Sequence, residues 1–317
     1  YDNTNYGAMS SAATGYTAMK LDAECNYWGD PSGRYHSSNP LAIGDTVSNK
    51  VDYNPWLTLS APSTACNGGV CYNTVYVDDN YDSNTLGWNV DHFASIQDGI
   101  DRVCDCGTVE VAAGTYTEQV IIQNKNLKLK GHHHSDTIIK MPSSGIRDVY
   151  VAESSHHYKT AVRILGYDHY SSGNDTVWGP NTITVEMSGF SIDCDNYDPG
   201  TSHRFAAILM RNVNNDNCGK ADIHHNKIYN LYAPVSPSAG AQTFGILGYG
   251  TMDVRIRGNR VKDFSRGGIG IYSGYADIKN NHVIGPHDGV TNLVHAPNGI
   301  QVGYGASGKK KKNTVSK

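Results

Sequence analysis

Residues 221–228 read ADIHHNKI, residues 254–261 read VRIRGNRV and residues 276–283 read ADIKNNHV, and this repeated phrase decides the fold of the chain. Its shared pattern is apolar, any residue, apolar, two of any residue, Asn, any residue, apolar. A second short apolar phrase precedes the copies of the first and occurs four times, at residues 207–210, 245–247, 268–271 and 299–302. Each repeat is therefore predicted to hold two short strands.

The asparagines of the phrase, at positions 226, 259, 281 and 313, lie 33, 22 and 32 residues apart. Repeats of this size are typical of solenoids or propellers. A propeller blade needs four strands and about 40 residues, which these intervals do not hold. No helical period of 3.6 appears between the strands. The pattern therefore predicts a coil of short parallel strands.

Three isoleucines, Ile223, Ile256 and Ile278, occupy the same position of the phrase. In a coil of stacked strands, each inward side chain lies about 4.8 Å above its counterpart in the next turn. We therefore expect these isoleucines to form one buried column. Asparagine at the bend tolerates left-handed backbone angles, and stacked amides can bond to one another along the column. The alternative is a β-sandwich whose Asn-rich turns are alike by accident.

Composition indicates a β-rich secreted protein. The 317 residues include only 18% charged residues, so Asn, Ser, Thr, Tyr and Gly supply most of the polarity. A net charge of -4 gives no reason to expect a nucleic-acid partner. No apolar stretch approaches the ~20 residues that cross a bilayer. The 21 tyrosines, against 5 phenylalanines, offer amphipathic rings that suit contact with sugars or another protein.

The repeats resemble those of the right-handed parallel β-helix proteins of the pectate-lyase-like superfamily, including extracellular members with parallel β-helix repeats. Residues 93–103 place Phe93, Ile96, Ile100 and Val103 on one face of a predicted helix. TVEVAAGTYTE at 108–118 and LKLKG at 127–131 follow, an order similar to the N-terminal helical cap and first coils of that superfamily. The resemblance implies an all-β right-handed parallel β-helix with an N-terminal α-helical cap over residues 74–317.

Residues 1–59 resemble the closing segment of such β-helices, in which Asn-x-Trp-Gly leaves the last coil and Pro-Trp-Leu ends the domain. Here these motifs contain Trp28 and Trp56. We favour a role for the two rings as plates over an exposed coil end rather than as platforms for sugars. Residues 60–73 contain Pro62, Gly68 and Gly69 and are predicted to be a linker.

A closing segment at the start of the chain is out of order, and the repeats run to Lys317. Lys310 also stands where the earlier copies of the phrase have isoleucine. One hypothesis is that residues 1–59 cover the open coil of a neighbouring copy, which gives a head-to-tail filament or surface layer. The alternative is that the sequence is a piece of a longer tandem array, with adjoining β-helix domains as partners.

The seven cysteines favour an oxidising compartment, and hence an extracellular or cell-surface location. Cys66 and Cys71 flank a four-residue segment and are candidates for a small disulfide loop. Cys194 and Cys218 are about one coil apart and are candidates for a bridge between adjacent turns. With an odd number of cysteines, at least one thiol is free or bonds outside the chain.

Candidate catalytic groups are few. Arg255 and Arg257 resemble part of the basic motif of polygalacturonases, and His287 with Asp288 resembles the motif of alginate epimerases, in which His and an acid handle the proton next to a uronate carboxylate. Gly285 stands where the epimerase motif has a leading aspartate. We interpret residues 286–288 as a surface turn in preference to a catalytic motif.

Metal binding has two candidate sets. Pectate lyases bind calcium through aspartates, and the resemblance makes Asp193 and Asp195 candidates for calcium ligands, although turn aspartates are commoner. The histidine runs 132–134, 156–157 and 224–225 could hold adventitious metal, and we interpret them as exposed polar residues. No cofactor is expected.

Three functions remain open. The preferred hypothesis is a non-catalytic extracellular surface protein that assembles with itself or mediates adhesion, with carbohydrate contact through tyrosine-lined faces. The second is a polysaccharide lyase or uronate epimerase acting on an acidic polysaccharide in a β-helix groove. The third is a carbohydrate-binding module.

Overall fold

The computed structural model describes most of the chain after residue 70, namely residues 71–166, 182–200, 202–215, 218–231, 242–250, 252–285, 297–303 and 306–316. Earlier it describes only four short strands. The chain divides into two compact units, Tyr1–Cys71 and Tyr72–Lys317. In the first unit β1 (Leu21–Asp22) pairs in parallel with β4 (Val51–Asp52), and β2 (Arg34–Tyr35) with β3 (Gly44–Thr46). Trp28 and Trp56 lie outside the described residues, so the closing role of residues 1–59 stays a prediction.

The second unit is built from three sheets of stacked strands. Sheet 1 has nine strands: β5 (Tyr72–Val77), β6 (His92–Phe93), β7 (Val103–Val111), β10 (Leu127–Gly131), β14 (Val185–Ser188), β17 (Asp222–His224), β20 (Asp253–Arg257), β23 (Tyr275–Lys279) and β26 (Ser307–Lys311). Sheet 2 has seven: β8 (Gly114–Thr117), β11 (Thr137–Lys140), β15 (Ser191–Asp193), β18 (Lys227–Tyr229), β21 (Arg260–Lys262), β24 (His282–Ile284) and β27 (Thr314–Ser316). Sheet 3 also has seven: β9 (Val120–Gln123), β12 (Val149–Val151), β13 (His156–Leu165), β16 (His203–Arg211), β19 (Thr243–Tyr249), β22 (Gly267–Ile271) and β25 (Asn298–Val302).

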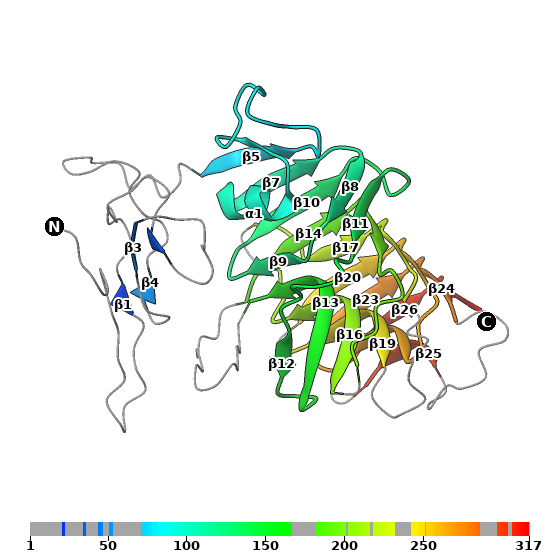
Figure 1. The fold of residues 1–317 in the computed structure, drawn as a ribbon. Helices are drawn as coiled ribbons and strands as arrows, with labels where there is room; N and C mark the ends of the chain where they lie inside the picture. Colours follow the sequence, from blue (N-terminus) through cyan, green and yellow to red (C-terminus); the bar gives the residue numbers. More distant parts are fainter. Residues whose placement is uncertain are drawn as a thin grey trace. The chain divides into compact units, whose positions relative to one another are not determined.

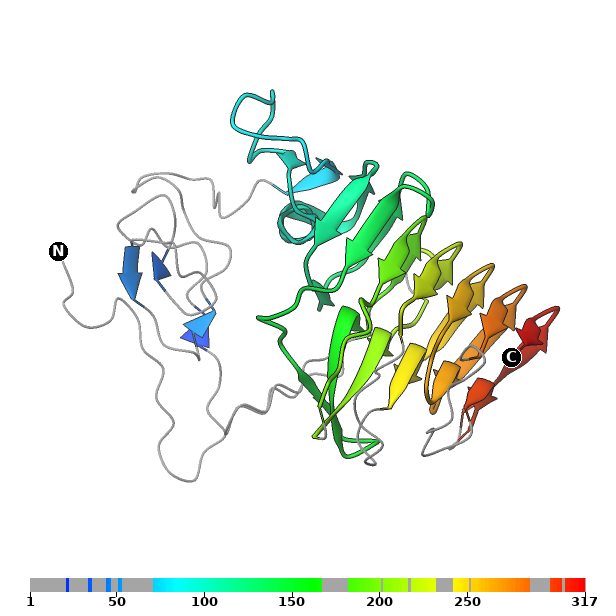
Figure 2. The ribbon, with the colours of Figure 1, turned by 45° about the vertical axis from the view of Figure 1, so that its right-hand side comes forward.

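The chain visits these sheets in a fixed order, from sheet 1 to sheet 2 to sheet 3 and back. From β7 onward each visit adds one strand beside its predecessor, except that one visit to sheet 3 adds the β12–β13 hairpin, so strands of successive turns lie side by side (Figure 1). The rows of arrows from cyan to red in Figure 2 are these stacked turns. Among the described strands, pairings between turns are parallel, and only β12 pairs antiparallel, with β13 inside one turn. The predicted fold class, an all-β parallel β-helix, is confirmed.

The interior holds the predicted column. Ile223 pairs in register with Ile256, and Ile256 with Ile278, and all three side chains are fully buried. The same position in the preceding turns is also apolar, and it is filled by Val75, Val109, Leu129 and Met187. Apolar side chains therefore form one continuous ladder inside sheet 1, because in a parallel stack each turn buries the residue of the next.

The bend between sheets 1 and 2 carries the predicted asparagine ladder. Asn226 Nδ2 donates to Asn259 Oδ1 at 3.2 Å, Asn259 to Asn281 at 3.0 Å and Asn281 to Asn313 at 3.0 Å. Asn259 Nδ2 also donates to the Ile223 carbonyl at 2.8 Å, one turn back. The first three asparagines are 1% exposed, so their amides satisfy buried main-chain groups that have no access to water.

The described residues of the second unit include one helix, α1 (Ile96–Arg102), which lies between β6 and β7. Its N-cap residue Ser95 accepts a hydrogen bond from the Asp98 amide, and the Glu118 carboxylate accepts from the Ile96 and Gln97 amides at 2.8 Å each. The expected apolar face is buried. A Cβ on Gly99 would lie 2.7 Å from a Val77 methyl, so glycine allows α1 to pack closely on sheet 1. That this helix caps the coil end stays a prediction.

The disulfide prediction for Cys194 and Cys218 is wrong. Cys218 bonds to Cys106, which is 112 residues earlier, with Cα atoms 5.2 Å apart. Cys194 is a free, fully buried thiol that packs in the apolar interior. Cys71 is disulfide-bonded, as is Cys104, while the other proposed partner, Cys66, lies outside the described residues.

Candidate functional site

The outer face of sheet 3 differs from an ordinary exposed sheet face because it carries a second apolar cluster. This outer cluster comprises nine residues that are each at most 4% exposed: Val149, Val151, Tyr158, Leu165, Ala206, Leu209, Phe244, Leu247 and Tyr249. The β12–β13 hairpin contributes four of them. Sheet 3 is therefore buried on both faces, which explains why β16 and β19 read as nearly continuous apolar runs.

Two glycines of β22 pack directly against this cluster. Phe244 and Leu247 of β19 belong to the outer cluster, and their register partners on β22 are Gly267 and Gly270. A Cβ on Gly267 would lie 2.9 Å from the Phe244 ring, and one on Gly270 would lie 3.3 Å from Tyr272. A side chain at Gly267 would press on the Phe244 ring, so glycine lets β22 pack closely against the outer cluster. A cavity of about 460 Å³ lies beside Phe244 and Tyr249 of this cluster.

Residues from four consecutive turns line this cavity, which we call the sheet 3 pocket. Its described lining is Glu153, Ser154, Arg204, Gln242, Phe244, Tyr249, Arg266, Tyr272 and Ser273. Its volume lies within the range of small-molecule sites, which is about 300–1,000 Å³. Convergent polar groups beside aromatic walls are the usual composition of such a site.

The described part of the pocket has an excess of positive charge. Arg211 donates through Nε and Nη2 to Glu153 Oε1, at 3.2 and 3.1 Å, so this ion pair neutralises the Glu153 carboxylate. Arg204 Nη1 donates to the neutral hydroxyl of Tyr158 at 3.3 Å. The Arg266 guanidinium has no hydrogen bond or ion pair within the described part of the chain. Two guanidinium groups, those of Arg204 and Arg266, are therefore left without a carboxylate partner among the described residues.

Three tyrosines form a stacked wall at the pocket. The Tyr158 and Tyr249 hydroxyls are 3.1 Å apart, and the Tyr249 ring centroid is 5.3 Å from that of Tyr272. Burial, and next to it the neighbouring Tyr158, raises the pKa of Tyr249 well above its usual range. The Tyr249 phenol is therefore neutral and can donate or accept hydrogen bonds at physiological pH. Tyr272 donates to Gln301 Oε1 at 3.2 Å, which fixes its ring.

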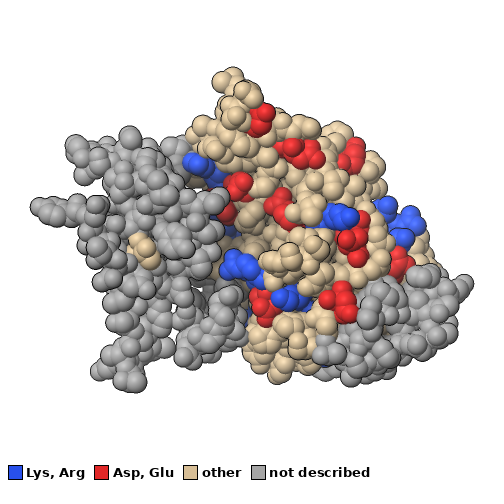
Figure 3. Space-filling model, viewed as in Figure 1, with Lys and Arg blue, Asp and Glu red and all other residues tan. Residues whose placement is uncertain are grey.

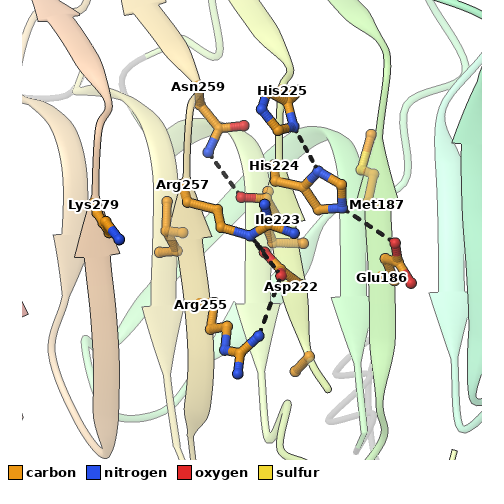
Figure 4. Close-up of polar contacts among 12 residues, drawn as sticks. Glu186, Met187, Asp222, Ile223, His224, His225, Arg255, Arg257, Asn259 and Lys279 are labelled. Atoms are coloured by element: carbon orange, nitrogen blue, oxygen red, sulfur yellow. Dashed lines mark hydrogen bonds and ion pairs between the residues drawn. The ribbon is translucent and has the colours of Figure 1, made fainter. Parts of the chain in front are cut away.

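The outer face of sheet 1 carries the predicted arginines, but it holds them in ion pairs. Arg257 Nε lies 2.8 Å and Arg255 Nη1 4.0 Å from Asp222 Oδ2 (Figure 4). On the strand of Asp222, β17, His224 bonds to Glu186 of β14 at 3.2 Å and to His225 at 2.8 Å. The basic groups of this face are thus interspersed with acidic ones. Figure 3 likewise shows blue and red side chains mixed over the visible described surface.

The remaining predicted site residues do not join these groups. His287 and Asp288 lie outside the described residues, so the lyase or epimerase site stays a prediction. Asp193 accepts from Asn230 at 2.8 Å, and Asp195 pairs with Lys140 at 3.8 Å, so both aspartates take part in local polar contacts at the bend after β15. Lys310 pairs in register with Ile278, as expected, and its side chain is exposed.

Sequence reasoning missed the pocket residues Arg204, Arg266 and Tyr272. Arg266 directly precedes the glycine-rich phrase GGIGI at 267–271, where the outer apolar row of the two preceding turns ends, but no local pattern marks Arg204 or Tyr272. A helix long and apolar enough to cross a membrane is not found in the described part of the chain.

Comparisons with known proteins found two solved structures with a similar chain path. One is the pectin methylesterase PemA from Erwinia chrysanthemi, with 12% sequence identity and a TM-score of 0.42, covering 78% of this chain and 66% of that one. The other is a pectin methylesterase in complex with hexasaccharide VII, with 13% identity and a TM-score of 0.41, covering 77% of this chain and 66% of that one. No family model and no curated protein matches. The chain thus spans just under two thirds of the length of these structures, and the likeness concerns the fold alone.

Proposed function

We propose that this protein acts outside the cell and binds an anionic carbohydrate in the sheet 3 pocket. The observation that carries this proposal is the meeting of two guanidinium groups with three aromatic rings in one hollow. Arg204 and Arg266 supply the charge, and Phe244, Tyr249 and Tyr272 supply the rings.

The aromatic rings suit the apolar faces of sugar rings. Tyrosine presents a flat apolar face together with a polar hydroxyl, so it can cover the C–H groups of a pyranose and bond to its hydroxyls. The contacts between Tyr249, Tyr158 and Tyr272 hold the wall in place before a ligand arrives. Pre-ordered rings lose little side-chain entropy on binding.

The guanidinium groups suit the carboxylates of uronic acids. A guanidinium presents paired N–H donors that match both oxygens of a carboxylate, and such charge-assisted bonds are about twice as strong as neutral ones. The net charge of the chain is -4, so the positive charge of the pocket is opposite in sign to that of the whole chain. The pocket therefore selects acidic sugars over neutral ones. The disulfides fit the oxidising conditions outside the cell.

Isothermal titration calorimetry with two hexasaccharides tests the proposal. We expect a hexamer of galacturonic acid to bind, and the neutral glucose hexamer cellohexaose to bind at least tenfold more weakly. Arg266→Gln should weaken uronate binding about tenfold, because a lost charged hydrogen bond is worth about 1.5 kcal/mol or more. Tyr272→Leu should weaken the binding of both sugars.

Arg255→Gln is the matched control, since it removes an arginine from the outer face of sheet 1. It should leave the affinity unchanged. Equal affinity for the two hexamers, no uronate binding, or an equal loss in Arg255→Gln and Arg266→Gln would each contradict the proposal.

A further inference from the structure

Three metal-ligating side chains from three separate segments meet at the N-terminal ends of β13 and β16. Asp148 directly precedes β12, His157 lies on β13 and His203 lies on β16. The two histidines are register partners, so the parallel stack sets their imidazoles side by side. One donor atom from each of the three residues lies within 4.8 Å of the others.

Two distances place the carboxylate relative to the imidazoles. Asp148 Oδ2 lies 2.6 Å from His157 Nδ1 and 3.5 Å from His203 Nε2. Ligand atoms that surround a tetrahedral zinc ion at about 2.1 Å are about 3.4 Å apart. The distance to His203 fits this spacing, and the 2.6 Å hydrogen bond to His157 lengthens by less than about 1 Å to admit the ion.

Neighbouring groups contact the two imidazoles and the main chain of Asp148. Ser202 Oγ lies 2.9 Å from His203 Nδ1, which leaves Nε2 facing Asp148. The Tyr150 ring packs 5.0 Å from the His157 ring, and Arg163 Nη1 donates to the Asp148 carbonyl at 3.2 Å. Support of this kind is what orients histidine and carboxylate ligands in metal sites.

The Asp148 carboxylate lies within 3.5 Å of both imidazoles. The Lys159 ammonium donates to the Ile146 carbonyl at 2.8 Å. A plain Asp–His ion pair would need only one of the two imidazoles, whereas both face the carboxylate.

One other described group, formed by Asp105, Cys106 and Cys218, has metal-ligand spacing. Its two sulfur atoms form a disulfide, so they are not thiolate ligands. His224 and His225 are close to each other, but the neighbouring Glu186 carboxylate bonds to His224 and not to His225. The Asp148 cluster therefore stands apart from these groups.

We propose that Asp148, His157 and His203 form a binding site for a divalent transition metal ion such as Zn²⁺, with two imidazole nitrogens and one carboxylate as ligands. Two histidines and one carboxylate are a common ligand set for such ions, and water fills the remaining positions. Successive residues of a strand point to opposite faces, so this site lies opposite Tyr158 and Arg204 and is separate from the sheet 3 pocket.

Titration of tag-free, chelator-dialysed protein with ZnCl₂ tests the proposal. We expect one saturable Zn²⁺ site per chain in calorimetry. Asp148→Asn and His203→Ala should each weaken binding at least tenfold. Ser202→Ala should weaken it about tenfold, as loss of an outer partner typically does. His224→Ala, which removes a histidine from sheet 1, is the control and should bind as the unmodified chain does.

Thermal unfolding of each variant in EDTA checks that the variant is folded. For the unmodified chain, electron paramagnetic resonance of one equivalent of bound Cu²⁺ gives a readout that needs no variant. Coupling to two imidazole nitrogens is expected. Absence of Zn²⁺ binding, equal binding by His203→Ala and His224→Ala, or coupling to fewer than two imidazoles in the unmodified chain would overturn the proposal.

Discussion

The outer faces of sheet 1 and sheet 3 share the same stack of parallel strands but differ in what covers them. On sheet 1, one outward row reads Lys128, Glu186, Asp222, Arg255, Asp277 and Lys309 from turn to turn. On sheet 3, the row through Leu209 and Leu247 is apolar and buried, and it then breaks at Gly270. The outer face of sheet 1 is charged and has no covering hairpin among the described residues, whereas the outer face of sheet 3 is covered and carries the sheet 3 pocket.

This difference shows that the repeat constrains the inside of the coil and leaves the outside free. An inward residue must be apolar, because it is buried between two turns and faces the other sheets. An outward residue meets solvent unless another segment covers it. On sheet 3 the β12–β13 hairpin and the outer cluster provide such cover. The sheet 3 pocket lies beside two residues of this cluster, Phe244 and Tyr249.

The strongest test of this contrast is Leu247→Ala. Leu247 points outward but is 0% exposed, so its removal should leave a cavity as costly as one inside the coil. We expect a loss of about 2–5 kcal/mol in the free energy of unfolding, the usual range for buried Leu→Ala changes. Urea denaturation followed by circular dichroism measures it.

Ile256→Ala, in the interior column, is the matched comparison and should cost a similar amount. If Leu247→Ala costs less than about 1 kcal/mol while Ile256→Ala falls within the usual range, the outer cluster is not a second core and the contrast between the two faces fails.

The interior could be predicted from the sequence because its constraint repeats. The shared position of Ile223, Ile256 and Ile278 and the recurring asparagine both follow from stacking, and each copy of the phrase reports the same requirement. The Cys106–Cys218 bond follows no such repeat. It depends on how residues 112 positions apart align after several turns of unequal length.

The pocket also could not be predicted in full, because its residues come from Glu153 to Ser273 and share no local pattern. Arg204 and Arg266 become neighbours of one cavity only through the register of sheet 3. The glycines of 267–271 were visible in the sequence, but which of them face outward depends on the register with β19.

A smaller effect is expected for Asp222→Asn on the open face of sheet 1. The Asp222 side chain is 6% exposed, and its carboxylate accepts two contacts from Arg257 Nε, at 2.8 and 3.1 Å. Asparagine keeps the shape but loses the charge. We expect a loss of about 1–2 kcal/mol, since Arg257 is partly exposed and regains water.

Asp277→Asn is the control from the same outward row, since no ion pair of Asp277 is found among the described residues. It should change the free energy of unfolding by less than about 0.5 kcal/mol. Equal effects of the two changes, or an Asp222→Asn effect as large as that of Leu247→Ala, would show that sheet 1 is not the simply solvated face described above.

The smallest expected effect is the pH dependence due to His225, at the bend after β17. Burial lowers the pKa of His225, and the neighbouring His224 and Arg257 lower it further against the opposing effect of Asp222. In the unfolded chain His225 titrates near its ordinary pKa of about 6.5. Between the two pKa values the unfolded chain binds more protons, so the free energy of unfolding falls as the pH drops below about 6.5.

His225→Asn should remove this contribution, because asparagine does not titrate and also tolerates the positive φ of 54° at this position. Unfolding free energies at about pH 7 and about pH 5 should therefore fall less in His225→Asn than in the unmodified chain. The comparison between the two proteins cancels the titration of the other histidines. An equal or steeper fall in the variant would contradict this prediction. It would mean that water screens His225 from the neighbouring charges on this face of sheet 1, so that they do not lower its pKa.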